Sequence, residues 1–375
     1  MAGIYIHIPF CKQACTYCNF HFSTNLGLQN DFTAALLREI ELRQAYIQGE
    51  MTETIYFGGG TPSILSSEAL QQILDSVSGH FKIVPNPEIT LETNPDDINP
   101  ARLQDWREAG INRLSIGVQS FFSEDLVWMN RAHNSEQAVR AVEDSKNAGF
   151  ENFSLDLIYG SPGLTEEKWE FNLQRAISMK PAHISCYALT VEPKTPLYHL
   201  IKMKKSVPVD PEKQASQFLT GIRVLEAAGF EHYEISSFAR PGKRSRHNSS
   251  YWKSKKYLGL GPSAHSFDGT SRQWNISNNA LYIKALNAGQ LCFESENLLP
   301  RDLLNEYIMT SLRTNEGLDL QHVIEHFGKQ KGSILENNAS VYIHSNQIEK
   351  KQKKLILTSE GKLFADGIAA ALFFD

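Results

Sequence analysis

A repeated junction between helix and strand limits most strongly how this chain can fold. Helical patterns end at Gly110, Gly149 and Gly229, and each glycine is followed at once by a segment rich in strand-forming residues. Glycine adopts the left-handed conformation that ends a helix without a steric penalty. The first of these helices is expected to start at Pro100, with Asn99 as its N-cap. The glycines stand 39 and 80 residues apart, which indicates a repeating unit of about forty residues.

Six short apolar segments are expected to be strands, with amphipathic helices between them. Strands that alternate with helices pair in parallel. The pattern therefore predicts an α/β fold, a partial (β/α)6 barrel of the TIM type. An open doubly wound sheet is the alternative, which periodicity alone does not exclude. The predicted strands cover residues 4–8, 54–57, 88–91, 113–118, 153–158 and 183–188.

The alternation stops after Ser237, which predicts three units. The barrel would cover residues 1–237, and a connecting segment rich in Ser, Asn, Gly and aromatics would cover 238–298. We expect most of this segment, from 239 to 295, to be irregular and to lie against the barrel. The last unit, 299–375, resembles a winged-helix arrangement. Its helical patterns cover 303–312, 318–327 and 332–343, followed by a hairpin around 350–358 and a final helix.

The composition excludes several classes of protein. The 375 residues carry 37 Lys and Arg against 42 Asp and Glu, a net charge of −5, which argues against a basic nucleic-acid coat protein. No apolar run is long enough to cross a bilayer, and no basic region followed by an apolar one opens the chain. We therefore expect a cytoplasmic protein that binds no nucleic acid. The run Lys350, Lys351, Lys353 and Lys354 is interpreted as a charged hairpin edge that discourages strand pairing.

Three of the five cysteines lie within eight residues, directly after the first predicted strand. Thiolates this close together, at Cys11, Cys15 and Cys18, favour a soft metal centre such as a cubane iron-sulfur cluster. Three cysteines cannot fill four iron positions, so one iron would stay open to a small chelating ligand. The alternative is a zinc knuckle that borrows His7 or His21.

Polar and glycine-rich segments follow the next strands. Gly58–Gly60 with Thr61 comes directly after the second strand, where glycines let the backbone approach a ligand closely. Glu92, Gln119 and Asp156 lie at or near the ends of later strands. In a barrel the ligand site is built at that face. Arg131 is a candidate cationic partner for the carboxylates, and the alternative for each residue is an ordinary strand or helix end.

Together these motifs are similar to the radical S-adenosylmethionine (SAM) superfamily, in the branch of oxygen-independent coproporphyrinogen III oxidase. The resemblance rests on Tyr5-x-His-x-Pro-Phe-Cys-x3-Cys-x-Tyr17-Cys, Gly58-Gly-Gly-Thr-Pro and Gly117-Val-Gln-Ser. It implies a 4Fe-4S cluster on the three cysteines, whose open iron is chelated by SAM. In the family, the reduced cluster cleaves SAM to methionine and a 5'-deoxyadenosyl radical. By position in the motifs, the SAM site would consist of Tyr5, Tyr17, Gly59, Gly60, Thr61, Glu92, Gln119, Arg131 and Asp156, with Tyr17 on the cluster or the adenosine.

Two departures separate the chain from the true oxidases of this branch. Phe20 stands where the motif of those enzymes has a fourth cysteine, and only four residues precede Tyr5. Both departures match the HemW group of heme chaperones, and so does the segment His247-Asn-Ser-Ser-Tyr251-Trp252. A histidine beside aromatics can offer an axial nitrogen and flat faces to a porphyrin. The candidate heme residues are His247, Tyr251, Trp252 and His265, and the alternative is a loop whose aromatics pack on the barrel.

The resemblance implies a chaperone that carries heme as cargo and passes it to an acceptor hemoprotein, and that lacks the oxidase activity. The alternative is the oxidase itself, which decarboxylates coproporphyrinogen propionates to vinyl groups. A third hypothesis is a zinc-stabilised binding module. Transient contact with a membrane at a delivery target is compatible with the sequence, although no amphipathic anchor is evident.

Overall fold

The computed structural model describes residues 1–47 and 49–375. Its centre is a twelve-stranded sheet in which six neighbouring strands pair in parallel and follow the chain order. A doubly wound sheet reverses its strand order at a switch point, so this order is that of a barrel. All six predicted strands are confirmed. They are β1 (Ala2–Ile8), β2 (Thr52–Gly59), β3 (Ile83–Thr93), β4 (Arg113–Gln119), β5 (Phe153–Tyr159) and β6 (His183–Ala188).

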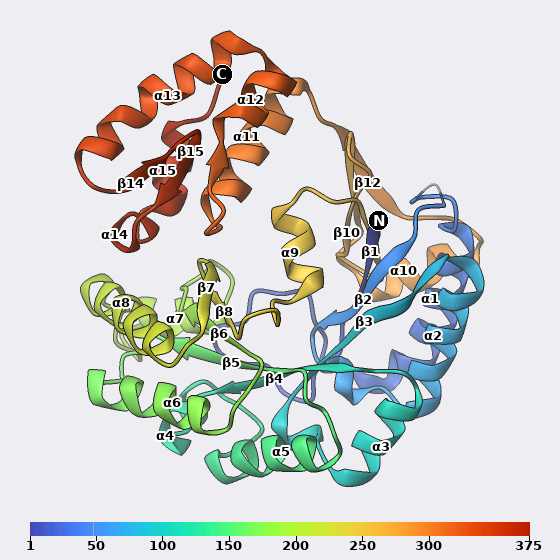
Figure 1. Ribbon diagram of the computed structural model, residues 1–375. Coiled ribbons are helices and arrows are strands. Elements are labelled where there is room, and N and C mark those ends of the chain that lie inside the picture. The colour runs from blue at the N-terminus through green and yellow to red at the C-terminus, as the bar shows by residue number, and fades with distance from the viewer. Residues whose placement is uncertain (48) are drawn as a thin grey trace.

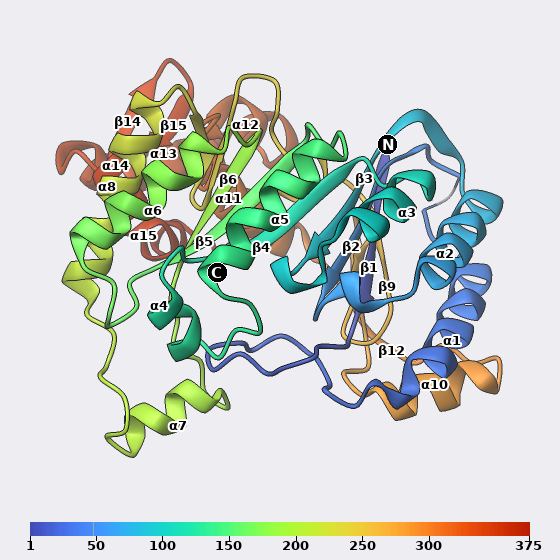
Figure 2. The same cartoon turned by 90° about the horizontal axis from the view of Figure 1, so that it is seen from below.

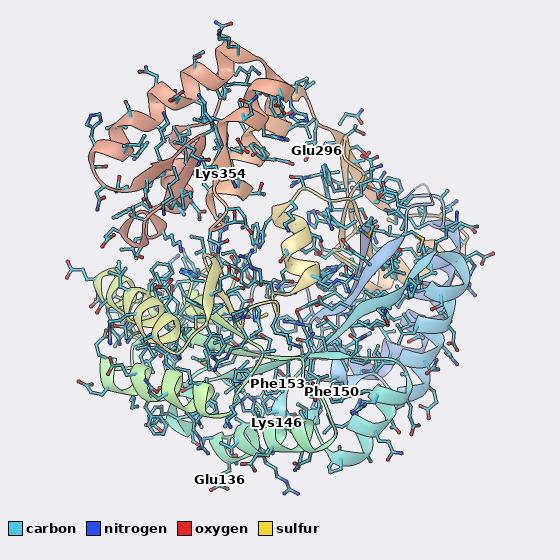
Figure 3. All side chains as sticks on the ribbon, in the orientation of Figure 1. Glu136, Lys146, Phe150, Phe153, Glu296 and Lys354 are labelled. Carbon is cyan, nitrogen blue, oxygen red and sulfur yellow. The ribbon has the colours of Figure 1, made fainter. Side chains whose placement is uncertain are left out.

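Helices cover the outer face of the curved sheet (Figure 1). The packing is amphipathic: Figure 3 shows the buried Phe150 and Phe153 close to the sheet and Glu136 of α5 on the outer side, and Lys146 of the same helix is exposed as well. β1 pairs with β2 and β9, and β6 with β5 and β8, so the barrel is partial, as predicted. The helices are α1 (Gln29–Leu42), α2 (Ser67–His80), α3 (Pro100–Glu108), α4 (Ser123–Trp128), α5 (Ser135–Asn147), α6 (Glu166–Ser178), α7 (Pro196–Lys202) and α8 (Pro211–Ala227).

The helix ends are built as predicted. The Asn99 side chain accepts the backbone N–H of Arg102 at 3.1 Å and caps α3, in which Pro100 is the first residue. Gly110 and Gly149 follow helices with φ of 98° and 83°, in the left-handed region. This backbone satisfies the last carbonyl groups of each helix and turns the chain directly into the next strand.

The expectation of an irregular segment over 239–295 is wrong. The segment contains α9 (Arg246–Trp252), α10 (Asn279–Asn287) and strands that extend the sheet beyond β1. Every residue of β12 is exposed, so this strand has no apolar alternation to reveal it. β7 (Glu231–Glu234) and β8 (Ser237–Ala239) extend the opposite edge, while the strands beyond β1 are β9 (Tyr257–Leu260), β10 (His265–Phe267), β11 (Ser271–Asn275) and β12 (Phe293–Asn297).

The last unit has its own hydrophobic cluster and a three-stranded sheet in the order β13-β15-β14. It lies above the open side of the barrel in Figure 1, and Figure 2 shows α15 from below, beside that opening. The predicted helices and hairpin are confirmed. The elements are α11 (Pro300–Leu312), β13 (Leu318–Asp319), α12 (Leu320–Phe327), α13 (Lys329–His344), β14 (Ile348–Lys351), β15 (Lys354–Leu357), α14 (Ser359–Lys362) and α15 (Ala365–Ala371).

In the part of the chain that the structure describes, no helix combines the length and the apolar character needed to cross a membrane.

Candidate functional site

A cavity of about 1080 Å³ lies at the carboxyl ends of the barrel strands. One side is formed by the cysteine loop after β1 and the glycine loop after β2, and the opposite side by residues 362–367 of the last unit. This volume is at the upper end of the range for small-molecule sites. The cavity is therefore large enough for more than one ligand.

All three clustered cysteines line this cavity. The hydroxyl of Thr61 donates to the sulfur of Cys11 at 3.4 Å, and the Arg131 guanidinium donates to that of Cys15 at 3.4 Å. Burial raises the pKa of the Cys11 thiol to about 11, because it disfavours the charged thiolate. The site thus offers three soft sulfur donors next to a cation, in surroundings where a bound metal is needed to hold the thiolates.

The donor set fits a cluster better than a single zinc ion. His7 uses Nε2 on the carbonyl of His21 at 2.8 Å and Nδ1 on the Tyr5 hydroxyl at 3.2 Å. His21 is engaged as well, since its Nε2 lies 2.7 Å from Oδ1 of Asn279. Within residues 1–47 and 49–375, no three His, Cys, Asp or Glu side chains are grouped as a single ion requires. A cubane spreads its ligands over separate irons, so its thiols need not meet at one point.

The glycine loop lies directly against the cysteine loop. The N–H groups of Gly60 and Thr61 donate to the carbonyls of Ile8 and Phe10 at 2.9 and 2.7 Å. A Cβ on Gly60 would lie 2.6 Å from the Phe10 carbonyl oxygen, closer than real contacts allow. Glycine is needed here for the approach of two backbones, which hold the cysteine loop over the cavity.

The two carboxylates predicted at strand ends both line the cavity. Glu92 accepts the Tyr56 hydroxyl at 2.7 Å, and Asp156 accepts the Ser115 hydroxyl at 2.8 Å. Burial, together with the charge of Asp156, raises the pKa of Glu92 to about 7, against the hydrogen bond from Tyr56. Burial also raises the pKa of Asp156, against the hydrogen bonds from serine hydroxyls. Glu92 can therefore hold or release a proton near neutral pH.

Arg131 makes different contacts from those expected. Its guanidinium donates to Oδ1 of Asn94 at 2.5 Å and to the Gly117 carbonyl at 3.0 Å, in addition to Cys15. Among the described side chains it forms no ion pair with Glu92 or Asp156. Its charge therefore acts on the cysteine loop, and the carboxylates rely on hydroxyl donors.

The remaining predicted SAM residues are divided. Tyr17 and Gln119 line the cavity together with Gly59, Gly60 and Thr61. Tyr5 does not line it; its ring lies behind the site, stacked with Tyr56 and with His247 at centroid distances of 6.1 and 6.4 Å. Eight of the nine predicted residues thus line the cavity, and Tyr5 does not.

The candidate heme residues lie elsewhere. His247 of α9 is buried near the amino ends of β2 and β3, with Nδ1 on the Thr54 hydroxyl at 2.8 Å and Nε2 on the Tyr251 hydroxyl at 2.9 Å. Burial lowers the pKa of His247 to about 3, so the ring is neutral. Both ring nitrogens are occupied in this arrangement.

Trp252 and His265 are also outside the cavity lining. The guanidinium carbon of Arg313 lies 5.4 Å from the centre of the Trp252 ring. His265 on β10 stacks on Trp274 with 6.0 Å between the ring centroids. The structure therefore does not bring these candidates together with the cysteine loop.

Sequence reasoning missed two parts of the cavity wall. Asn94, which connects Arg131 to the Thr61 hydroxyl at 3.2 Å, follows β3 and could have been found by the strand-end rule that found Glu92. Lys362 and its neighbours up to residue 367 come from the last unit, and no local signal relates them to the barrel.

Comparisons with known proteins agree with this fold and site. Residues 5–176 match the family model of the radical SAM superfamily. A solved structure, coproporphyrinogen III oxidase (HemN) from Escherichia coli, superposes with a TM-score of 0.86 at 23% identity, covering 99% of this chain and 90% of that one. The fold and the cysteine loop thus define a radical SAM protein, a class whose members carry a 4Fe-4S cluster and SAM.

Curated relatives indicate one family within the radical SAM superfamily. The heme chaperone HemW of Bacillus subtilis is 32% identical over 99% of both chains, and that of Mycobacterium tuberculosis is 32% identical over 99% of this chain and 94% of its own. HemW of Escherichia coli is 39% identical over 70% of this chain and 69% of its own. The chain belongs to the HemW family of radical SAM proteins.

Proposed function

We propose that this protein binds heme and passes it to an acceptor hemoprotein, with a 4Fe-4S cluster and SAM as bound cofactors. The observation that carries the proposal is the similarity to HemW heme chaperones over nearly the whole chain. Phe20 supports the proposal. Its side chain lines the cavity at the position where the motif of the oxidases has a fourth cysteine. Its 67% exposed ring offers an apolar contact instead of an iron ligand.

Cys11, Cys15 and Cys18 would hold the cluster, which supplies an electron to SAM when both are bound. The cavity residues of the predicted SAM set would orient SAM, and Arg131 would balance the negative charge of the thiolates. Tyr5, which does not line the cavity, would support the site through its contacts with His7 and Tyr56. We propose further that residues 1–237 form the unit that carries this site, that 299–375 completes its wall, and that 238–298 connects the two units.

His247, Tyr251, Trp252 and His265 stay predicted heme contacts. Coordination by His247 would require its ring to give up the hydrogen bond to Thr54 or to Tyr251. We propose that the protein works in the cytoplasm, on the basis of its unpaired cysteines.

The experiment uses anaerobically reconstituted protein in two parallel assays. Titration with heme should give a saturable Soret change at one heme per protein, and transfer to an apo-hemoprotein should follow. Incubation with SAM, reductant and coproporphyrinogen III should give no protoporphyrinogen. Turnover to protoporphyrinogen, or no Soret change at stoichiometric protein, contradicts the proposal. A colourless anaerobic preparation would instead favour the zinc-stabilised module.

A further inference from the structure

A half-buried lysine on the last unit faces the cavity from the side opposite the cysteine loop. Lys362, at the end of α14, lines the cavity, and its ammonium donates to Nδ1 of His232 at 2.9 Å. The other nitrogen of His232, Nε2, donates to the Ile235 carbonyl at 3.1 Å, so Nδ1 is the acceptor. The ammonium is thus held by a neutral ring.

Lys362 forms no ion pair with a carboxylate of the described residues, since no carboxylate oxygen lies within 4.0 Å of its ammonium. Burial lowers its pKa, and the more distant charges of Glu226 and Glu234 oppose this shift. A partly buried cation with a neutral partner retains most of its desolvation cost, which a bound anion would offset. The ammonium can therefore accept an anion from the cavity.

A second cation lies at the same wall. Arg313 donates through Nη1 to Asp366 at 2.7 Å, and Asp366 is 81% exposed on its side chain. The buried Nε of Arg313 has no hydrogen-bond partner in the described structure. Both Arg313 and Asp366 line the cavity with Lys362, so two cations and one carboxylate face it from this wall, and the buried carboxyl of Glu234 interacts electrostatically with both cations.

The space between this wall and the cysteine loop is largely apolar. Phe20 from the cysteine loop and Phe364 from the last unit are exposed, at 67% and 56%, and line the same cavity. Ile158 and Phe218 of the barrel line it as well. A flat apolar ligand with carboxylates at one edge would meet aromatic faces and the two cations at once.

We propose that Lys362 and Arg313 form a carboxylate site for the heme propionates, which places the heme in this cavity between the barrel and the last unit. The inference rests on the proposed function and gives the cargo a position in the cavity, in place of the predicted contacts His247, Tyr251, Trp252 and His265, which lie outside it. It also assigns the last unit a direct part in binding.

The test compares heme with its dimethyl ester, in the same detergent buffer, on holoprotein. The wild type should bind heme about tenfold to a hundredfold more tightly than the ester, because the ester cannot pair with the cations. Lys362→Met should weaken heme binding by a similar factor and leave ester binding unchanged, whereas Lys362→Arg should retain heme binding. Lys354→Met, at an exposed lysine of the same unit outside the cavity (Figure 3), is the matched control.

The outcomes separate the two proposals. If the wild type binds neither heme nor ester, the proposed function falls and this inference with it. If the wild type binds heme and ester equally, or Lys362→Met binds heme as the wild type does, only the carboxylate site is overturned. Loss of SAM affinity in Lys362→Met with heme affinity unchanged would assign the site to the SAM carboxylate and also overturn it. The ligand comparison on the wild type decides even if Lys362→Met does not fold.

Discussion

The two ends of the barrel are both rich in side chains that can bind metals and ligands, but they use them differently. At the carboxyl ends of the strands, three thiols, two carboxylates and Arg131 face a cavity of about 1080 Å³. At the amino ends, the ring of His247 stacks on Tyr56 at 4.9 Å and is 1% exposed. The groups at the carboxyl ends face the cavity and can contact a ligand. At the amino ends, the nitrogens of His247 are hydrogen-bonded to Thr54 and Tyr251.

The two ends are nevertheless connected. Tyr56 stacks on His247 on one side and donates to Glu92 at 2.7 Å on the other. The backbone N–H of His247 donates to the Glu88 carboxylate at 3.0 Å, and this hydrogen bond connects α9 with β3. We therefore expect changes at the amino end to act through stability and positioning, and changes at the carboxyl end to act on cofactor binding.

The largest effect is expected for the cysteine loop. Changing Cys11, Cys15 or Cys18 to Ser should abolish the cluster, because each thiolate would hold a separate iron. Iron and sulfide analysis and the visible absorption of the reconstituted protein measure this. Cys292→Ser, at a partly exposed cysteine outside the cavity, should retain both. Full iron content in any of the three loop variants would contradict the assignment.

The next largest effect is expected at His247. His247→Ala should lower the free energy of unfolding by about 3–5 kcal/mol, because it leaves a void and strips Thr54 and Tyr251 of their partner. Denaturant unfolding measures the change. His265→Ala, at an exposed position, should change it little.

Heme titration of the same variant decides between the two roles of His247. If the ring only supports the fold, the heme affinity of His247→Ala stays at the wild-type value. Loss of the axial-ligand signature in the Soret region, at a concentration of denaturant where the variant is folded, would instead favour coordination.

A third prediction concerns pH. The pKa of Glu92 is raised to about 7 in the folded protein from an ordinary value of 4.5, so the native state binds more protons than the unfolded state between these values. The contribution of Glu92 to the stability of the cofactor-free protein should therefore fall as pH rises through this window, by at most roughly 3 kcal/mol. Unfolding of the wild type and of Glu92→Gln at pH 5 and pH 8 measures it as the change in the difference between the two proteins, because the buried histidines, whose pKa values are lowered, act in the opposite direction in both.

The difference in the free energy of unfolding between the wild type and Glu92→Gln should therefore change between pH 5 and pH 8, whereas the difference for Glu136→Gln, at an exposed position on α5, should not. A Glu92→Gln variant with the full pH dependence of the wild type would show that another group is responsible.

The smallest effect is expected for the glycine loop. Gly60→Ala should lower the free energy of unfolding by about 1–3 kcal/mol and weaken cluster binding, since the new methyl group meets the carbonyls of Phe10 and Ile8. Gly79→Ala, near the end of α2 with no atom within 4 Å of the new Cβ, should stabilise the protein by up to about 1 kcal/mol. Equal effects at both positions would contradict the close approach of the two loops.

The barrel was predictable because its signals are local. Apolar runs define the six strands, and glycines such as Gly110 end the helices between them. The rule that ligand sites lie at the carboxyl ends of barrel strands then placed Glu92, Gln119 and Asp156 at the cavity. Strand β9 was not predictable, because its partner is β1, which lies more than 250 residues earlier in the chain.

The sequence by itself determined the fold class, the cysteine loop and most of the cavity residues, since each depends on neighbours close in the chain. Only the tertiary structure decided that His247 is occupied by Thr54 and Tyr251, and that Lys362 reaches the cavity. Whether a nitrogen is free, or an ammonium unpaired, depends on groups brought close by folding. The same residue types in the same order are compatible with either outcome until their partners are known.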